Sequence, residues 1–276
     1  MKKLINQHPR SVGRLFLGLM PFLLIALIYT GASNARLAEN PNDKLLPSFS
    51  SFAAAIDRLA FTPSKRSGEY LFWQDTLSSL KRLAMGVGIS AAIGLSIGVL
   101  NGVVPYLRAG MSPLVTAVSL IPPMAILPVL FIVFGLGELS KVVLIVIGIA
   151  PFLIRDIQQR TLEIPAEQLI KAQTLGANTW QILVRVVLPQ VMPRLLAAVR
   201  LSLGSAWLFL IAAEAIAATD GLGYRIFLVR RYLSMDVILP YVAWITFLAF
   251  LLDYLLRKVS LWAYPWFHSN TSGANT

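Results

Sequence analysis

A single carboxylate within a long apolar segment is the first candidate for chemistry in this chain. Glu214 follows Arg200 by fourteen residues, about 21 Å along a helix that rises 1.5 Å per residue. It therefore lies in the outer half of the apolar segment 195–218, far from Arg200. An ionisable group in hydrocarbon is costly and normally faces water or other helices. Glu214 is expected either to line a transport pathway or to bond to the loop at 219–223.

Three prolines interrupt a second apolar segment, 112–134. Pro122, Pro123 and Pro128 donate no backbone hydrogen bond, so they kink or break a helix. The carbonyls that they release need partners from neighbouring groups or water. We expect a broken helix here, either beside a pathway or bent only for packing. With Glu214, these prolines are the candidate pathway residues.

A polar segment, 163–193, separates two apolar segments and has the pattern of short helices. Apolar residues recur at helical spacing on both sides of Gly176. Gly176 is suited to the positive-φ position that ends a helix, and Asn178 or Thr179 is suited to cap the next one. Pro189 and Pro193 are expected to end the polar piece. Such a segment either docks in a groove of another protein or lies on the membrane face.

Residues for enzymatic chemistry are scarce. The sequence has no G-x-x-x-x-G-K-[ST] nucleotide motif, and its two histidines, His8 and His268, lie near the two ends. It has no cysteine, which excludes disulfides and cysteine-ligated metals. We expect no catalytic residue, no metal site and no cofactor. A membrane-embedded enzyme would need His, Asp or Glu clustered within the membrane.

The composition predicts an all-α polytopic membrane protein. Hydrophobic residues make up 57% of the chain and charged residues 13%, against about 25% charged residues in soluble domains. Several apolar runs approach the roughly 20 residues that cross a bilayer. About six spans are expected, at 15–31, 76–100, 112–134, 140–155, 195–218 and 237–257. In the second span, Gly94, Gly98 and Gly102 have the spacing of a close helix contact.

The net charge of +11 is best explained by basic flanks of membrane helices, and no nucleic-acid partner is expected. The basic N-terminal tail, with Lys2, Lys3, Arg10 and Arg14, is expected in the cytoplasm. Six crossings then place the C-terminus and the segment 155–200 in the cytoplasm too. Five basic residues fall outside against this rule: Lys81, Arg82, Arg225, Arg230 and Arg231. Asp253 is expected to be solvated or to pair with Arg257.

The polar segment resembles the E-A-A-x3-G-x9-I-x-L-P motif of binding-protein-dependent ABC importer permeases. Ala172 and Gly176 match the second Ala and the Gly, and Val186, Leu188 and Pro189 match the end of the motif. Ile170 replaces the motif's Glu, and Lys171 replaces its first Ala. Further similarity, over 75–266, is to the nitrate/sulfonate/taurine-type branch. It is strongest in 119–142 and 199–224.

The resemblance implies the type I importer fold and a division of the chain into three parts. Residues 1–75 are expected to form an uncleaved N-terminal membrane helix, rather than a signal peptide, followed by an external amphipathic segment capped at Ser48. Residues 76–260 are expected to form the permease core with a cytoplasmic coupling loop at 156–194, and 261–276 a flexible tail. The implied ATPase-coupling residues are Lys171, Ala172, Gly176, Ala177, Val186, Leu188 and Pro189.

The implied partners are a cytoplasmic ABC ATPase dimer, a periplasmic or lipid-anchored solute-binding protein, a second permease copy and membrane lipid. The implied location is the bacterial inner membrane, with several crossings and ATP hydrolysis in the separate subunit. The solute would be of the nitrate, sulfonate or taurine class, or a guanidine- or urea-like molecule, as 168–177 and 220–247 suggest. The alternative is an ion- or proton-coupled secondary transporter, which would normally show a repeated half and several midplane charges.

Overall fold

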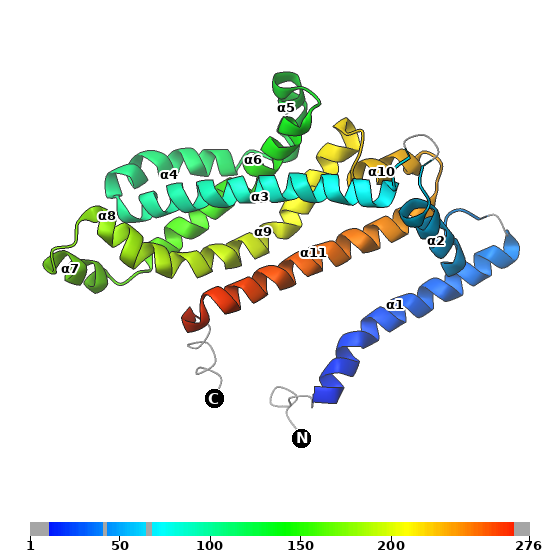
Figure 1. Cartoon of the computed structure of the whole chain (residues 1–276), viewed down its shortest axis with the longest axis horizontal. Helices are drawn as coiled ribbons and strands as arrows, with labels where there is room; N and C mark the ends of the chain where they lie inside the picture. Colours follow the sequence, from blue (N-terminus) through cyan, green and yellow to red (C-terminus); the bar gives the residue numbers. More distant parts are fainter. Residues whose placement is uncertain (1–10, 41–42, 65–67, 268–276) are drawn as a thin grey trace.

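The computed structural model describes residues 11–40, 43–64 and 68–267, and within these ranges it contains helices and no strand. Figure 1 shows the helices as a long, tilted bundle from which α1 diverges. The N-terminal elements are α1 (Ser11–Glu39), α2 (Phe49–Ile56), the π-helix η2 (Asp57–Phe61), α3 (Leu71–Val103), α4 (Pro105–Ser119), the 3-10 helix η3 (Pro123–Ile126) and α5 (Leu127–Phe134). They are followed by α6 (Glu138–Leu162), α7 (Ala166–Thr174), α8 (Thr179–Ile182), the π-helix η4 (Leu183–Val187), α9 (Leu188–Ala217), α10 (Leu222–Arg230) and α11 (Met235–Ala263).

Helix α6 is the centre of the bundle and packs along both α3 and α9. Glycines on α3 allow the closest approach, as their spacing predicts. A Cβ added to Gly94 would lie 2.6 Å from the Cβ of Leu153, and one added to Gly102 would lie 2.3 Å from that of Thr161. Small residues permit such backbone contact where lipid supplies no hydrophobic drive between helices. The predicted close helix contact is confirmed.

Four helices are long and apolar enough to cross a membrane, or five when α4 and the following η3–α5 count as one broken span. Six spans were predicted, and the difference is the segment 140–155 within α6. Its uncharged stretch, 142–154, lies between Lys141 and Arg155 and is shorter than the roughly 20 residues of a full crossing. α6 is nevertheless largely buried among the other helices.

The proline-rich segment is a broken helix, as predicted. Pro105–Ser119 and Pro123–Phe134 meet at 79°. The break falls at Pro122, whose backbone is extended. Pro128 lies in the first turn of α5, where its missing N–H would have no helical partner in any case. The adjacent prolines Pro122 and Pro123 therefore make the break, and Pro128 only starts the next helix.

The short helix predicted after Ser48 is also present. The Ser48 side chain accepts a hydrogen bond from the backbone N–H of Ser51 and caps α2. The Tyr29 hydroxyl of α1 donates to the carbonyl of Pro47 at 2.7 Å, so the end of α1 is fastened to the start of this helix. η2 extends α2 as far as Phe61.

Two predicted boundaries fall within helices. The boundary between residues 75 and 76 lies in α3, so the core begins at Leu71. The tail predicted from residue 261 begins within α11, and Arg194 lies over the ring of Phe267 at 4.6 Å. The rest of the tail, 268–276, lies outside the described residues, as do the basic residues Lys2, Lys3 and Arg10.

Candidate functional site

The turn at Gly176 is a complete helix-ending motif. The Gly176 N–H donates to the Gln173 carbonyl at 2.9 Å, and the Ala177 N–H donates to the Ala172 carbonyl at 3.0 Å. These two bonds define a Schellman motif, which requires positive φ at the glycine. Gly176 has a φ of 82°. The predicted turn is confirmed.

The second short helix begins at a capping box. The Asn178 side chain accepts from the Gln181 N–H at 2.8 Å, and the Gln181 side chain accepts from the Asn178 N–H at 2.9 Å. Asn178 is therefore the cap, and Thr179 is the first helical residue. The two reciprocal bonds satisfy donors that a helix start otherwise leaves open. α7 and α8 are thus held at a fixed angle by bonds on both sides of the turn.

Pro189 and Pro193, which were expected to end the polar piece, do not end its helix. The helix runs without a break from Thr179 to Ala217. The π-helix η4 directly precedes Pro189, and the Leu188 N–H donates to the Leu183 carbonyl, five residues back. This wider turn accommodates the proline ring, which would otherwise clash with a carbonyl one turn earlier. The short helix is therefore rigidly continuous with the span α9.

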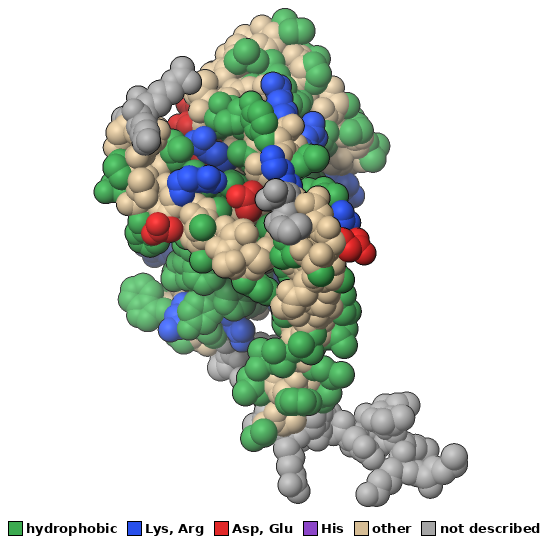
Figure 2. Space-filling model, turned by 90° about the vertical axis from the view of Figure 1, so that its right-hand side faces the viewer, with side chains coloured by type: hydrophobic (Ala, Val, Ile, Leu, Met, Phe, Trp, Pro, Cys, Tyr) green, Lys and Arg blue, Asp and Glu red, His purple; other side chains and the backbone are tan. Residues whose placement is uncertain are grey.

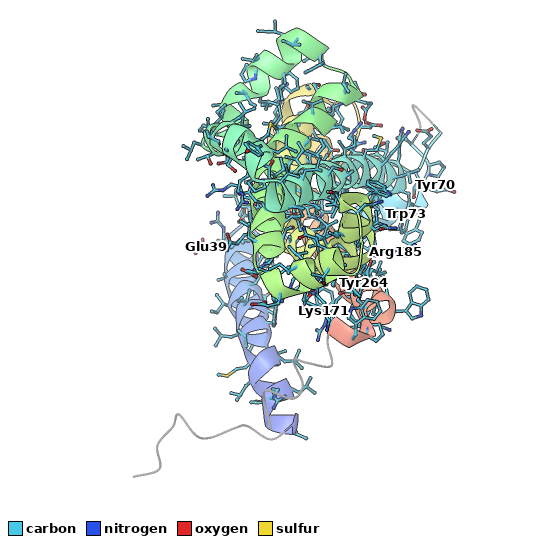
Figure 3. All side chains as sticks on the ribbon, turned by 90° about the vertical axis from the view of Figure 1, so that its left-hand side faces the viewer. Glu39, Tyr70, Trp73, Lys171, Arg185 and Tyr264 are labelled. Carbon is cyan, nitrogen blue, oxygen red and sulfur yellow. The ribbon has the colours of Figure 1, made fainter. Side chains whose placement is uncertain are left out.

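The residues predicted for ATPase coupling divide into two groups. Ala172 and Ala177 are half-buried and pack against the hydrophobic cluster around Ile182 and Val187. Val186 and Leu188 are also half-buried, whereas Lys171, Gly176 and Pro189 are exposed. Figure 3 looks onto this end of the molecule, where Lys171 and Arg185 lie. The motif positions thus shape and anchor the segment more than they form its surface.

Large apolar side chains that the motif does not include form that surface. Ile170 is 57% exposed, Leu175 81% and Trp180 71%. All three lie on α7, on α8 or at the turn between them. Sequence reasoning identified Ile170 only as a departure from the motif. We call Ile170, Leu175 and Trp180 the coupling surface.

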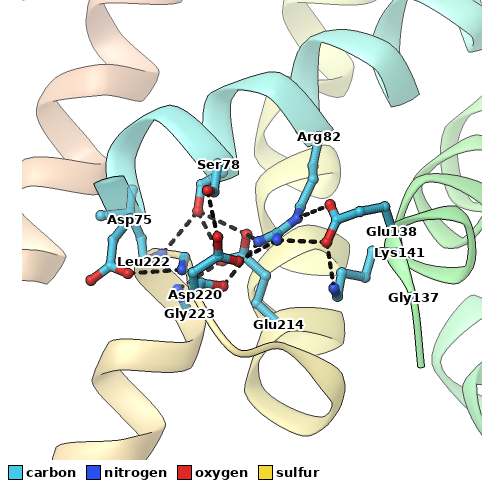
Figure 4. A network of polar contacts seen from close by, with 12 residues as sticks. Asp75, Ser78, Arg82, Gly137, Glu138, Lys141, Glu214, Asp220, Leu222 and Gly223 are labelled. Atoms are coloured by element: carbon cyan, nitrogen blue, oxygen red, sulfur yellow. Dashed lines mark hydrogen bonds and ion pairs between the residues drawn. The ribbon is translucent and has the colours of Figure 1, made fainter. Parts of the chain in front are cut away.

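At the other end of the bundle, Glu214 is fully buried in a polar network (Figure 4). Its carboxylate accepts from Arg82 Nη1 at 2.8 Å, from Ser79 Oγ at 2.8 Å and from the Gly223 N–H at 2.9 Å. The bond to Gly223 is the contact with the 219–223 loop that was one of the two expectations. Three helices, α3, α9 and the first turn of α10, therefore meet at one carboxylate.

Arg82 connects this carboxylate to two more acids. Its guanidinium also bonds to Glu138 of α6 and to Asp220 in the loop after α9. Lys141 Nζ bonds to Glu138 at 2.9 Å. Burial raises the pKa of Asp220, but the hydrogen bonds from Arg82 and Ser78 outweigh it, so the net pKa is lowered. The cation thus holds α3, α6 and the loop together.

A second buried acid lies beside this network. Asp75 bonds to Arg225 Nε at 2.8 Å and to the Gly221 N–H at 2.9 Å, and the Tyr241 hydroxyl donates to it at 3.2 Å. Arg82 and Arg225 were counted as external charges that break the positive-inside pattern. Both form ion pairs with buried acids. Figure 2 looks onto this end and shows acidic and basic side chains among hydrophobic ones.

Sequence reasoning missed Arg82 and Asp75 as network members, although one signal was available. Glu214 and Arg82 are opposite charges within two predicted spans, and charges in such spans usually pair with each other. Asp253 was expected to be solvated or to pair with Arg257, and its side chain is 41% exposed. Asp253 pairs with Arg200, at 2.8 and 2.9 Å, and not with Arg257, because Arg200 faces it from the neighbouring helix α9.

The candidate pathway residues do not form one site. Glu214 is enclosed in the network, whereas Pro123 lines a cavity of about 820 Å³ between α4 and α6. The polar residues on its wall are Ser112, Thr116, Ser119, Arg155, Asp156, Gln158 and Gln159. Phe209 of α9 and Ile147 of α6 add apolar surface. Within the described residues, no group of three or more His, Asp or Glu side chains is placed to hold a metal ion.

Comparison with known proteins identifies the family to which this chain belongs. Residues 85–268 match the family described as binding-protein-dependent transport system inner membrane component. The taurine transport system permease protein TauC of Escherichia coli K12 is 34% identical over 194 residues, which cover 70% of each chain. The bicarbonate transport system permease protein CmpB of Synechococcus elongatus is 30% identical over 257 residues, covering 89% of this chain and 87% of its own.

Solved structures show the same fold. A chain of the inward-facing MetNI methionine ABC transporter aligns with a TM-score of 0.62 and 23% identity, covering 71% of this chain and 97% of its own. A bacterial ABC transporter that imports alginate aligns with a TM-score of 0.54 and 14% identity, covering 89% and 94%. At these identities the likeness concerns the fold alone. The all-α architecture is that of type I ABC importer permeases.

The chain therefore belongs to the binding-protein-dependent transport system inner membrane component family. It is a multi-pass permease subunit of the nitrate/sulfonate/taurine branch and is not itself an enzyme. This membership favours the importer over the secondary-transporter alternative. The family depends on a solute-binding protein and an ABC ATPase.

Proposed function

We propose that this chain conducts a small oxyanionic solute across the bacterial inner membrane, while a separate cytoplasmic ATPase dimer hydrolyses ATP. The proposal for the solute is supported by three relatives, named for taurine, bicarbonate and aliphatic sulfonates. These solutes share a sulfonate or carbonate group with several acceptor oxygens. A guanidine- or urea-like solute has no such group.

The coupling surface is the observation that carries the proposed ATPase contact. Ile170, Leu175 and Trp180 are apolar and exposed, yet they lie on a polar, rigidly capped segment rather than on a membrane span. A large aromatic side chain beside aliphatic ones is typical of the energetic centre of a protein interface. Since Ile170 replaces the motif's Glu, the contact is apolar where a salt bridge was expected.

The continuity of α8, η4 and α9 provides a mechanical link. A load applied to Trp180 by the ATPase would be transmitted along one helix to Glu214, near the opposite end of α9. Closure of the ATPase dimer would then rock the helices of each permease as rigid bodies. We propose that two copies of this chain line the pathway together, and that the solute-binding protein delivers the solute at the α10 end.

Orientation follows from the same arrangement. The end that carries α7 and α8 is rich in basic residues: Arg155, Arg160, Lys171, Arg185 and Arg194. By the positive-inside rule, this concentration of basic residues favours the cytoplasm for this end. The proposal therefore places α7, α8 and both termini in the cytoplasm.

The ATPase contact is tested by placing a charge on the coupling surface. Trp180→Asp should abolish co-purification of the cognate ATPase and ATP-driven uptake, while the permease stays in the membrane. Tyr232→Asp is the matched control, because Tyr232 is equally exposed (68%) but follows α10 at the opposite end. Retention of the ATPase by both Trp180→Asp and Leu175→Asp would refute the proposed contact.

A further inference from the structure

Arg155 is a cation without a counter-charge on the wall of the cavity between α4 and α6. It follows the uncharged stretch 142–154 of α6, and its Nη1 donates to Ser119 Oγ of α4 at 3.2 Å. In the described part of the chain, no carboxylate lies within ion-pair distance of Arg155. An arginine has five N–H donors, so most of its donors are left for another partner.

Three arginines that bridge helices differ from Arg155, which is exposed on the cavity wall. Arg82, Arg200 and Arg225 each form an ion pair with an acid on another helix or loop. Those three pairs hold helices together and leave no net charge for a ligand. Arg155 is exposed, and charges of a membrane protein that face a water-filled cavity normally mark a solute or ion pathway. Arg155 is therefore the functional candidate among these arginines.

The surroundings of Arg155 suit an anion. Thr116 and Ser119 bring hydroxyl groups to one wall of the cavity, and Gln158 and Gln159 bring amides to the other. Apolar surface from Ile147 and Phe209 lowers the local dielectric, which strengthens a charged hydrogen bond. The volume, about 820 Å³, is ample for a small organic or inorganic anion.

The one acid on this wall is already partly compensated. Asp156 lies beside Arg155 in the sequence, but its Oδ1 faces Arg160 Nε at 3.7 Å. Arg160 comes from one turn further along α6, outside the cavity lining. Arg160 also pairs with Glu163 at 3.1 Å. Of the two charged side chains on the cavity wall, Arg155 is the one without an ion-pair partner. This favours an anion over a guanidinium cation or neutral urea.

We propose that Arg155 binds the oxyanion group of the transported solute, with the Thr116 hydroxyl as a further donor. The Ser119 hydroxyl already donates to the Thr116 carbonyl at 2.8 Å, and it orients Arg155 by accepting from Nη1. The planar guanidinium presents two parallel N–H groups, which match two oxygens of a sulfonate, carboxylate or bicarbonate. This assignment rests on the proposed function to the extent that the solute is an anion. It identifies the side chain that recognises the solute's charge within the permease.

The absence of cysteine from the sequence permits a test that does not depend on transport. Thr116→Cys places a single thiol on the cavity wall, one helical turn from Ser119. We measure the ratio of its reaction rate with the anionic sulfonatoethyl methanethiosulfonate to its rate with the cationic trimethylammonium analogue. This ratio should be several-fold higher than the same ratio for free glutathione, since a nearby cation attracts the anion. Addition of Arg155→Gln should reduce this preference to the glutathione value, and excess methanesulfonate should slow the reaction only when Arg155 is present.

Arg257→Gln in the same single-cysteine protein is the matched control. It removes one positive charge from an exposed position on α11, away from the cavity lining. The reagent preference should not change. A preference that is equal with and without Arg155 would overturn the assignment, and would leave Arg155 as only a basic flank of its helix.

The second measurement is uptake by the complete complex of permease, ATPase and binding protein in proteoliposomes. With taurine, methanesulfonate or bicarbonate as the probe, Arg155→Gln should lower uptake per ATP hydrolysed by about tenfold or more, the effect of losing a charged hydrogen bond. Where Arg155→Gln does not assemble, Arg155→Lys replaces it. Lysine should keep the reagent preference and lower uptake, because it lacks the two-pronged geometry.

The two proposals fail in different ways. If the wild-type complex takes up none of the three probes, the proposed solute class is wrong. A different outcome is that the wild-type complex takes up one of them and the variant, Arg155→Gln or Arg155→Lys in its place, takes it up equally well. In that case the assignment of Arg155 is wrong and the proposed function stands.

Discussion

Arg82 of α3 and Glu214 of α9 form an ion pair in which both side chains are shielded from solvent. Nη1 and Oε1 are 2.8 Å apart, and the two side chains are 3% and 0% exposed. The partners are 132 residues apart in the sequence. The pair therefore ties α3 to the C-terminal part of α9. The loop that joins α9 to α10 folds over both side chains.

Removal of one partner should destabilise the fold rather than alter solute recognition. Glu214→Gln should lower the free energy of unfolding by about 3 kcal/mol, because breaking a buried pair leaves the remaining charge under-compensated. The thermal unfolding midpoint of the purified protein and its abundance in the membrane should both fall. The double variant Arg82→Gln/Glu214→Gln should lose less than the sum of the single variants. An unchanged midpoint with impaired uptake would instead place Glu214 in the pathway.

The pair between Arg200 and Asp253 should behave differently. Its bonds are similarly short, at 2.8 and 2.9 Å, but its side chains are 28% and 41% exposed. Partly exposed pairs contribute at most about 1 kcal/mol, because solvent and salt screen the charges. Arg200→Gln should therefore shift the unfolding midpoint far less than Glu214→Gln does. An equal loss of stability from the two variants would contradict this distinction between buried and exposed pairs.

Local features of this fold could be predicted from the sequence because their causes are local. The turn at Gly176 could be predicted because this glycine lies between two stretches with helical apolar spacing. The cap at Asn178 could be predicted because Asn178 directly precedes the second stretch. The bend at Pro122 and Pro123 follows from the missing backbone donors, and the Ser48 cap from a serine before an apolar stripe. Each of these elements is decided by a few neighbouring residues.

The network and the cavity could not be predicted in the same way, since they depend on which helices meet. Glu214 was conspicuous in the sequence, but its partners Arg82, Ser79 and Gly223 come from elements whose packing the sequence does not state. Arg155 was seen only as one basic residue of an inner flank. The continuation of the helix through Pro189 required a π-turn, and the sequence has no clear signal for one.

The contact between α3 and α6 predicts a contrast between two glycines of one helix. Gly102→Ala would place a Cβ 2.3 Å from the Cβ of Thr161, whereas a Cβ on Gly88 meets nothing within 4 Å. Overpacking a tight contact costs about 1–3 kcal/mol. The unfolding midpoint should fall for Gly102→Ala and stay level or rise for Gly88→Ala. Equal behaviour of the two variants would mean that α3 and α6 are not in close contact in the protein.

Gly176 allows the geometry of the turn to be tested apart from packing. Its φ is 82°, and a Cβ there would meet no atom within 4 Å. A substitution therefore changes only the backbone energy, and alanine should cost about 1 kcal/mol at this left-handed position. Asparagine tolerates this conformation better, so Gly176→Asn should retain more of the ATPase than Gly176→Ala, and Gly176→Val should retain least.

The measurement is co-purification of the ATPase with each variant after a graded thermal challenge. Gly110→Ala is the control, because Gly110 lies in α4, has no positive φ and also leaves room for a Cβ. It should match the wild-type protein. The angle between α7 and α8 decides how Ile170, Leu175 and Trp180 are presented, so loss of the ATPase should follow the order of backbone strain. If Val, Ala and Asn at position 176 all retained the ATPase as well as glycine does, the Schellman turn would not be what positions the coupling surface.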